Sequence, residues 1–192
     1  AEVVRDVPFY DESGGGVSFS GGEPLFQARF LRSLLKACGR YDIHRVVDTS
    51  GYAAADTFRE IARDTDLFLF DLKHMDSGTH RSWTGVNNER ILFNFKMLAD
   101  MNRGVIVRIP LIPGFNDDPD HLRKLGRFIS GIRGSCHVDL LPYHDFQKSK
   151  YVKFGMTYRG RGIDHTRPRP VGEVAAQLKE FGLHVTVEGE DQ

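Results

Sequence analysis

The sequence predicts an α/β fold built around a parallel β-sheet, and two observations support this prediction. Six short β-rich runs alternate along the chain with segments of helical periodicity. Most of the runs end in polar residues, as the strands of α/β folds do where a site forms at their carboxyl ends. Alternation of strand and helix implies parallel βαβ units, arranged as an open doubly wound sheet or as a barrel or part-barrel.

The expected elements follow one another without a linker or a literal repeat. The strands are expected at residues 17–20, 44–48, 67–73, 105–110, 137–141 and 184–187. Apolar residues at helical spacing predict helices through Phe26, Phe30, Leu34 and Cys38; through Ile91, Phe95 and Leu98; through Leu122, Leu125, Phe128, Ile129 and Ile132; and through Val171, Val174, Ala175, Leu178 and Phe181. A short helix is expected over residues 56–63 with Asp56 as its N-cap, and residues 13–16 are expected to form a flexible turn.

The composition is that of one globular domain of 192 residues. Lys and Arg balance Asp and Glu at 26 each, so no net field favours nucleic acid or an anionic membrane. A transmembrane helix needs an apolar run of about 18 residues, and the chain has none. Its first residues lack the basic and apolar regions of a signal peptide. Its two cysteines, Cys38 and Cys136, form neither a disulfide framework nor a metal motif. We therefore expect a cytoplasmic protein with neither a nucleic-acid nor a membrane partner.

Polar residues follow five of the expected strands. The segments at the carboxyl ends of these strands that contain the polar residues are 20–24, 48–50, 71–73, 108–110 and 141–144. In the third segment, Asp71 and Lys73 share one face of the strand with Leu69, and the residues between them are apolar. A carboxylate and an ammonium on an apolar strand are costly to bury unpaired, so they form a structural ion pair or part of a site. The four other polar strand ends favour a site.

Residues 20–24, Ser-Gly-Gly-Glu-Pro, lie between an expected strand and an expected helix. Glycines in such a turn let a ligand approach the backbone, and its N–H groups can bind a carboxylate. The segment is not a P-loop, because no Gly-Lys-Ser/Thr follows, and Glu23 would repel phosphate and pair with an ammonium. A loop that accepts both an amine and a carboxylate suits an amino-acid moiety.

This segment resembles the GGE motif with which radical S-adenosylmethionine (SAM) enzymes hold the methionyl amino group. The wider pattern resembles the activating enzymes of glycyl radical enzymes, the family of pyruvate formate-lyase activating enzyme. Six stretches in family order, covering nearly the whole chain, carry the resemblance: residues 14–23 (GGGVSFSGGE), 47–52 (VDTSGY), 70–75 (FDLKHM), 84–86 (TGV), 108–114 (RIPLIPG) and 140–144 (LLPYH).

The resemblance implies a radical SAM-type (β/α)6 part-barrel with SAM at its strand ends. The implied SAM-binding residues are Gly21, Gly22, Glu23, Asp48, Asp71, Lys73, Arg108 and His144, and the implied catalytic residues among them are Asp71, Lys73 and Arg108. Residues 21–23 would hold the methionyl amine. Asp71 and Lys73 would contact the ribose and carboxylate region, and Arg108 and His144 would complete the pocket. Asp48, Thr49 and Asp71, with the backbone of Leu69, match positions that can hold a monovalent cation beside the SAM carboxylate.

The resemblance also implies a reaction and its partners. In the family, a reduced [4Fe-4S] cluster cleaves SAM to methionine and a 5′-deoxyadenosyl radical, which removes a Cα hydrogen from one glycine of a partner enzyme. The implied partner is pyruvate formate-lyase or a related glycyl radical enzyme, under anaerobic conditions, with flavodoxin or ferredoxin as the electron donor. The protein would orient the bond to be broken, and the redox chemistry would belong to the cluster.

The chain departs from the family pattern because it has no CxxxCxxC motif, which follows the first strand and supplies the cluster's thiolates. Cys38 lies in an expected helix and Cys136 lies just before a late strand, so neither replaces it. We therefore expect residues 1–192 to be a single-domain fragment of the radical SAM core that begins at the family's second strand. Such a fragment is expected to be inactive in isolation.

Two other interpretations remain open from the residues alone. Lys73 at a barrel strand end would suit an aldolase-type barrel that forms a Schiff base with a carbonyl substrate, although Asp48 and residues 20–24 would then have no role. The chain could also be a partner-binding scaffold without catalysis. Solvent-facing positions are expected for His74, His121 and His165 and for the basic stretch 159–169. The sequence does not identify the glycyl radical enzyme that would be activated.

Overall fold

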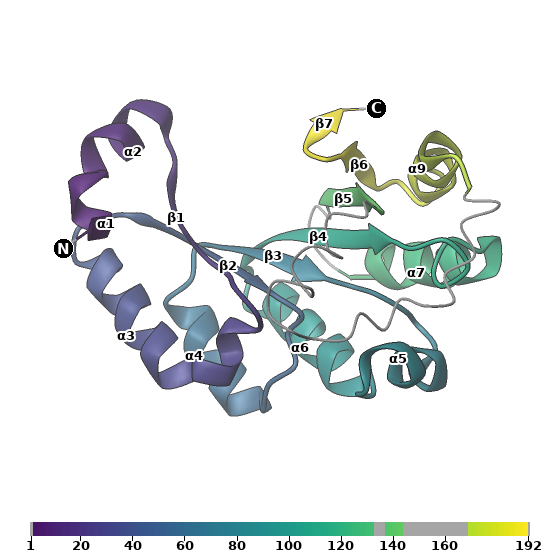
Figure 1. Cartoon of the computed structure of the whole chain (residues 1–192), viewed down its shortest axis with the longest axis horizontal. Helices are drawn as coiled ribbons and strands as arrows, with labels where there is room; N and C mark the ends of the chain where they lie inside the picture. The colour runs from purple at the N-terminus through teal and green to yellow at the C-terminus, as the bar shows by residue number, and fades with distance from the viewer. Residues whose placement is uncertain (1, 133–136, 144–168, 192) are drawn as a thin grey trace, which may run out of the picture.

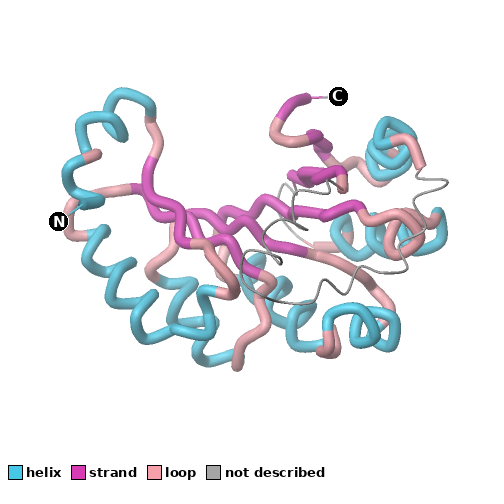
Figure 2. The backbone as a smooth tube through the Cα atoms, in the orientation of Figure 1, coloured by secondary structure: helices cyan, strands magenta, loops and turns pink. Residues whose placement is uncertain are grey.

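The computed structural model describes residues 2–132, 137–143 and 169–191. Its strands form one sheet, flanked by helices (Figures 1 and 2). The strands are β1 (Gly16–Phe19), β2 (His44–Thr49), β3 (Leu67–Asp71), β4 (Gly104–Leu111), β5 (His137–Pro142), β6 (His184–Val187) and β7 (Glu190–Asp191). The helical elements are α1 (Glu2–Arg5), α2 (Val7–Ser13), the 3₁₀ turn η1 (Pro24–Gln27), α3 (Ala28–Gly39), α4 (Ala55–Arg63), α5 (Ser77–Thr84), α6 (Glu89–Asp100), α7 (Pro119–Ser130) and α9 (Val171–Lys179).

The strand order decides between the two predicted architectures. The strands lie in sequence order from β1 to β7; β1 to β6 are parallel, and β7 pairs antiparallel with β6. A doubly wound sheet would reverse its strand order at a switch point, whereas a barrel adds each strand beside the previous one. Helices α3, α4, α6, α7 and α9 follow the outer side of the curved sheet (Figure 1). The predicted part-barrel is therefore confirmed.

The core lies between the sheet and these outer helices. Phe68 and Phe70 of β3 are fully buried and face Phe58 of α4, with ring centroids 5.6 and 6.1 Å away. Leu69 and Asp71 alternate with them and are partly exposed on the inner face of the sheet. The predicted alternation along this strand is confirmed, and it directs Asp71 away from the core.

An ion pair joins the opposite, amino-terminal ends of β2 and β3. The guanidinium of Arg45 donates from Nε and Nη2 to the two carboxylate oxygens of Asp66, each at 2.8 Å. Burial alone would raise the pKa of Asp66, but the hydrogen bonds and charge of Arg45 outweigh burial and lower that pKa. This ion pair links β2 to the start of β3, at the end of the sheet opposite the polar carboxyl ends of the strands.

The buried face of α3 differs from the prediction. Phe26 and Phe30 are 79% and 61% exposed, whereas Leu31, Leu35 and Cys38 are buried. Residues 24–27 form η1, so Phe26 precedes the helix, and the phase of α3 is set by buried residues at i, i+4 and i+7. The pattern therefore places Cys38 on the buried face correctly, but Phe26 and Phe30 lie off that face, which continues through Leu35 and Leu31 instead.

Two local predictions near helix and strand starts are wrong. Asp56 is not an N-cap: α4 begins at Ala55 with Ala54 before it, and Asp56 accepts a hydrogen bond from Arg59 instead. Residues 13–16 are not simply a turn, because Gly16 belongs to β1. A Cβ at Gly16 would lie 2.1 Å from the carbonyl oxygen of His44, so the close approach of β1 to β2 requires glycine here.

The histidine prediction fails at His121. This side chain is 4% exposed, because it lies on the face of α7 that packs against the loop after β3, where its ring stacks on His74 with centroids 4.2 Å apart. Burial, with a contribution from the charge of His74, lowers the pKa of His121 to about 4. His74 is only partly exposed, and His165 and residues 159–168 lie outside the described residues.

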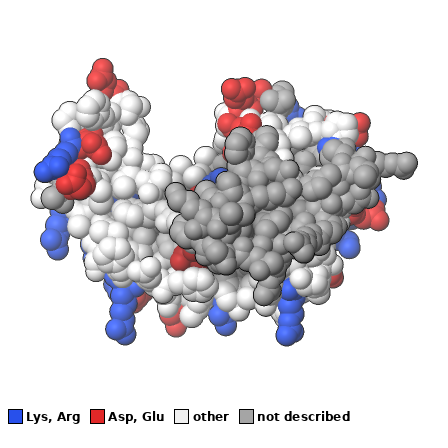
Figure 3. All heavy atoms as spheres, in the orientation of Figure 1, with Lys and Arg blue, Asp and Glu red and all other residues white. Residues whose placement is uncertain are grey.

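The surface carries charges of both signs. On the face shown in Figure 3, basic and acidic side chains are interspersed along the outer helices, in keeping with the balanced composition. Among the described residues, none of the helices has both the length and the apolar character that a membrane span requires.

Candidate active site

A cavity of about 400 Å³ lies at the carboxyl ends of β1 to β5. Each of the five polar strand-end segments contributes to its wall. The lining residues are Ser20, Gly21, Gly22, Glu23, Asp48, Thr49, Ser50, Asp71, Lys73, Arg108, Pro110, Leu111, Ile112, Leu141, Pro142 and Tyr143. Seven of the eight predicted SAM-binding residues therefore line this one cavity. The eighth, His144, lies outside the described residues. The volume falls within the range of small-molecule sites.

The glycines of the loop after β1 leave space for a ligand. Gly21 has φ 127°, a conformation that side-chain-bearing residues rarely adopt. A Cβ added at Gly21 or at Gly22 would have no heavy atom within 4 Å. Both backbones therefore border open space in the cavity, as expected where a ligand approaches the main chain.

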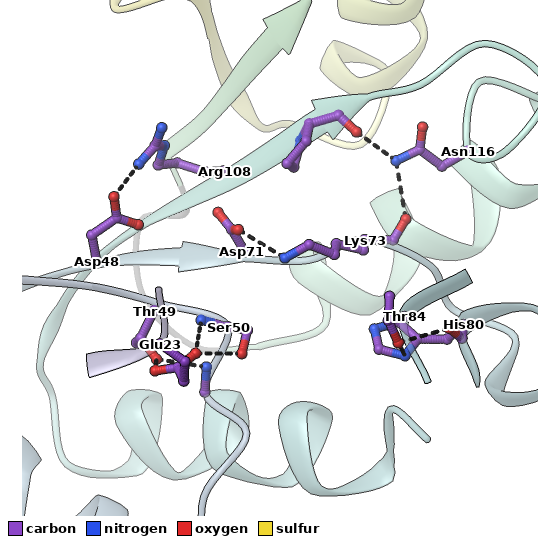
Figure 4. A network of polar contacts seen from close by, with 12 residues as sticks. Glu23, Asp48, Thr49, Ser50, Asp71, Lys73, His80, Thr84, Arg108 and Asn116 are labelled. Carbon is purple, nitrogen blue, oxygen red and sulfur yellow. Dashed lines mark hydrogen bonds and ion pairs between the residues drawn. The ribbon is translucent and has the colours of Figure 1, made fainter. Parts of the chain in front are cut away.

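Glu23 is held by hydrogen bonds from the loop after β2 (Figure 4). Its Oε1 accepts from Thr49 Oγ1 at 2.6 Å, and its Oε2 accepts from the backbone N and the Oγ of Ser50 at 3.0 and 2.6 Å. Oε1 also accepts from the N–H of Leu25 at 3.1 Å, which caps η1. These donors are neutral, so they fix the orientation of the carboxylate and leave its charge available to a cationic group.

Two ion pairs stand on the neighbouring strands. Arg108 Nη1 lies 2.7 Å from Asp48 Oδ2, and Lys73 Nζ lies 2.8 Å from Asp71 Oδ2 (Figure 4). Their side chains are 23–29% exposed, so the charges are largely but not fully withdrawn from water. Asp71 and Arg108 occupy paired positions of β3 and β4, which brings the two ion pairs together.

Asp48 has a perturbed acidity. Its pKa is raised chiefly by burial and further by the negative charge of Asp71, while Arg108 and Lys73 only partly offset these effects. A carboxyl group in a cavity whose pKa is shifted by burial and by named charged neighbours is typical of functional sites.

Ser50 and Asn116 contribute to the site, and sequence reasoning did not single them out. Ser50 donates two hydrogen bonds to Glu23, and Asn116 fixes the backbone that carries Lys73. Ser50 lay inside the stretch VDTSGY, and Asn116 lies two residues beyond RIPLIPG. A polar residue within or beside a motif was thus the signal that could have identified them.

The predicted cation-binding residues already have protein partners. Asp48 and Asp71 are ion-paired, and Thr49 Oγ1 donates to Glu23 and accepts from the N–H of Gly51 at 2.9 Å. Within the described ranges, no group of three or more His, Cys, Asp or Glu side chains is placed to hold a metal ion.

Comparison with known proteins identifies the family of the chain that forms this site. The profile described as Radical SAM superfamily matches residues 1–125. The chain is 37% identical over 188 residues to the choline trimethylamine-lyase activating enzyme of Oleidesulfovibrio alaskensis, covering 96% of this chain and 61% of that protein. It is 36% identical over 186 residues to pyruvate formate-lyase 1-activating enzyme of Escherichia coli K12, covering 96% and 76%.

A solved structure supports the same assignment. A domain of pyruvate-formate lyase-activating enzyme from Bacteroides vulgatus superposes with a TM-score of 0.72 at 35% identity, over 91% of this chain and 99% of that domain. The chain belongs to the radical SAM superfamily and, within it, to the family of the activating enzymes to which it is 36–37% identical. It spans between three fifths and about three quarters of the length of those two relatives.

Proposed function

We propose that this chain forms the SAM-binding part of an activating enzyme that generates a glycyl radical on a partner enzyme. The observation that carries the proposal is the arrangement of charges in the cavity. A carboxylate held by neutral donors, Glu23, faces the same space as the cationic side chains of Lys73 and Arg108. The methionyl end of SAM presents an ammonium and a carboxylate, which this arrangement complements.

Each side chain has a role in this proposal. Glu23 accepts the methionyl ammonium, and the loop after β2 keeps its oxygens oriented. Lys73 and Arg108 neutralise the methionyl carboxylate, and Asp71 accepts hydrogen bonds from the ribose hydroxyls. Charge-assisted hydrogen bonds of this kind are about twice as strong as neutral ones, so they fix the position of the bond that reacts.

The open space at Gly21 and Gly22 fits SAM, which when bound supplies the 5′-deoxyadenosyl group for hydrogen abstraction. A cluster with three thiolate ligands does not fit these residues, because the 192-residue chain contains two cysteines. Cys38 is buried on α3, and burial raises the pKa of its thiol, which disfavours the thiolate that metals require. A [4Fe-4S] cluster acting at this cavity would need ligands from outside these residues.

We extend the proposal to the surroundings of the site. A monovalent cation beside the SAM carboxylate would use Asp48, Thr49 and Asp71, which are among the residues that line the cavity. The partner would be a glycyl radical enzyme that presents its glycine loop to the same opening, and a flavodoxin or ferredoxin would donate the electron in the cytoplasm. The two relatives are named for different partners, choline trimethylamine-lyase and pyruvate formate-lyase.

The Schiff-base alternative loses support from the geometry. A Schiff-base lysine must present a neutral amine to a carbonyl carbon. Lys73 Nζ instead lies 2.8 Å from Asp71 Oδ2, so Asp71 already engages the nitrogen that would have to attack the carbonyl carbon.

The proposed activity is tested by electron paramagnetic resonance on the cluster-loaded protein that carries this chain. It is mixed anaerobically with SAM, a reductant and a candidate glycyl radical enzyme. A glycyl radical doublet on the partner, absent without SAM and strongly reduced by Glu23→Gln, is the expected result. An intact cluster that yields no radical on pyruvate formate-lyase, choline trimethylamine-lyase or related glycyl radical enzymes would contradict the proposal.

A further inference from the structure

Asn116 lies in the loop between β4 and α7, and its side chain is fully buried. Its Nδ2 donates to two backbone carbonyls, that of Lys73 at 3.0 Å and that of Pro110 at 2.8 Å (Figure 4). Its Oδ1 accepts from the N–H of Ile112 at 2.7 Å. Both N–H donors and the oxygen of this buried carboxamide are therefore hydrogen-bonded to the backbone.

The position of Asn116 follows from the end of the β3–β4 ladder. The last backbone hydrogen bond between these chain segments runs from the N–H of Leu72 to the carbonyl of Arg108 at 3.0 Å. The next donor from β4 would be residue 110, but Pro110 has no N–H. The carbonyls of Lys73 and Pro110 both need donors, and a primary amide that faces both supplies them. Asn116 thus continues the link between the two strands beyond the point where backbone pairing stops.

We propose that Asn116 is a positioning residue for SAM binding and acts through Lys73. By fixing the Lys73 carbonyl, it fixes the backbone from which Nζ reaches Asp71 and the cavity. The identity of the ligand, SAM, rests on the proposed function. The link between Asn116 and the Lys73 backbone does not depend on it.

The adjacent residue provides a matched control. Asp117 is also buried in this loop, and its Oδ1 accepts from the N–H of Gly114 at 2.8 Å. Its Oδ2 lies 3.4 Å from the N–H of Arg169. Asp117→Ala therefore removes partly buried hydrogen bonds of the same loop without removing the bond from Asn116 to the Lys73 carbonyl.

The test is a double-mutant cycle on the 192-residue chain, with SAM affinity measured by titration. Asn116→Ala should weaken SAM binding about three- to tenfold, a coupling typical of residues that share one network. In a Lys73→Ala background the same substitution should change the affinity less than about twofold, because its effect passes through Lys73. Asp117→Ala should leave SAM affinity within about twofold of the wild type in both backgrounds. Equal weakening by Asn116→Ala in both backgrounds, or none in either, overturns the proposal.

Amide hydrogen exchange provides a second readout that needs no ligand. The N–H groups of Leu72 and Met75 flank Lys73 and are hydrogen-bonded to Arg108 and His121. They should exchange faster in Asn116→Ala than in Asp117→Ala, and unchanged exchange contradicts the positioning role. If Asn116→Ala does not fold, Asn116→Asp serves instead, because it keeps the acceptor for Ile112 and loses the amide donors. Failure of the wild type to bind SAM would count against the proposed function, while the exchange comparison would still decide the link to Lys73.

Discussion

The side chains around Glu23 show which parts of the site could be predicted at the scale of single residues. Glu23 and Lys73 were identified because a charged residue at a strand end, next to glycines or to an opposite charge, is informative by itself. Ser50 and Asn116 were not, because their partners are 27 and 43 residues away in the sequence. A hydroxyl or a carboxamide can bond to any nearby group, so its role emerges only when the fold brings that group close.

Lys73→Ala should weaken SAM binding about ten- to a hundredfold, because it removes a charge-assisted hydrogen bond worth about 1.5–3 kcal/mol. Isothermal titration of SAM into the variant measures the change. Lys96→Ala is the matched control, since Lys96 lies over the ring of Phe128 on an outer helix, away from the cavity. An affinity equal to that of the wild type would reduce Lys73 to a structural partner of Asp71.

Gly22→Ala should separate binding from folding. The added methyl group would touch no heavy atom within 4 Å, so the urea midpoint should remain within experimental error of the wild type. The same methyl would occupy space that the ligand needs, so SAM affinity should fall by about tenfold or more. Normal SAM binding by a folded Gly22→Ala protein would show that the ligand does not approach this backbone.

At the scale of elements, prediction succeeded where two signals agreed. In β3 the alternation of apolar and polar residues and the β-rich composition indicate the same strand and the same inner face, and both are correct. In the segment leading into α3 the signals conflict: Phe26 and Phe30 have the spacing of a buried face, but Pro24 starts a 3₁₀ turn that shifts the helix. Helix α5 was missed, because its eight residues bury a single side chain, His80, and therefore show no apolar periodicity; the Asp76 carboxylate, which caps the N–H of Thr79 at 2.8 Å, was the signal that could have located its start.

The corrected face of α3 can be tested by stability. Leu35→Ala should lower the free energy of unfolding by about 2–5 kcal/mol, because Leu35 is fully buried. Phe30→Ser should change it by about 0.5 kcal/mol or less, because that ring is mostly exposed. Urea denaturation followed by circular dichroism measures both, and a larger loss for Phe30→Ser would restore the original assignment of the face.

The ion pair between Arg45 and Asp66 should make stability depend on pH. The folded-state pKa of Asp66 is lowered, so its contribution is complete above the unfolded-state pKa of about 3.9 and is lost as the pH falls through the folded-state value. Asp66→Asn should therefore cost about 1–3 kcal/mol at neutral pH, and this difference from the wild type should shrink as the solution is acidified below about pH 4.

Urea midpoints measured from neutral to acid pH provide the comparison. Asp11→Asn, which changes an exposed carboxylate of α2, is the control and should leave the profile unchanged. A difference between Asp66→Asn and the wild type that stays constant with pH would mean that the ionised carboxylate does not stabilise the fold.

For the whole molecule, alternation of strands and helices predicted a parallel sheet but left its closure open. The resemblance carried by six stretches selected the part-barrel, and the sequential strand order agrees with it. Strand β7 was not predicted, because a strand of two residues is too short for any periodicity to be read. The convergence of five strand ends on one cavity follows from this topology, since parallel neighbours end at the same edge.

The most direct test of the central claim is a titration of the isotope-labelled 192-residue chain with SAM, followed by its amide NMR spectrum. Binding at the cavity predicts saturable shifts at Gly22, Ser50 and Arg108, which follow or belong to three different strands. The amides of Arg45, Thr65 and Gly104, at the opposite ends of the strands, should stay unchanged. Shifts confined to that opposite end, or no saturable shift at millimolar SAM, would contradict the assignment of this cavity to SAM.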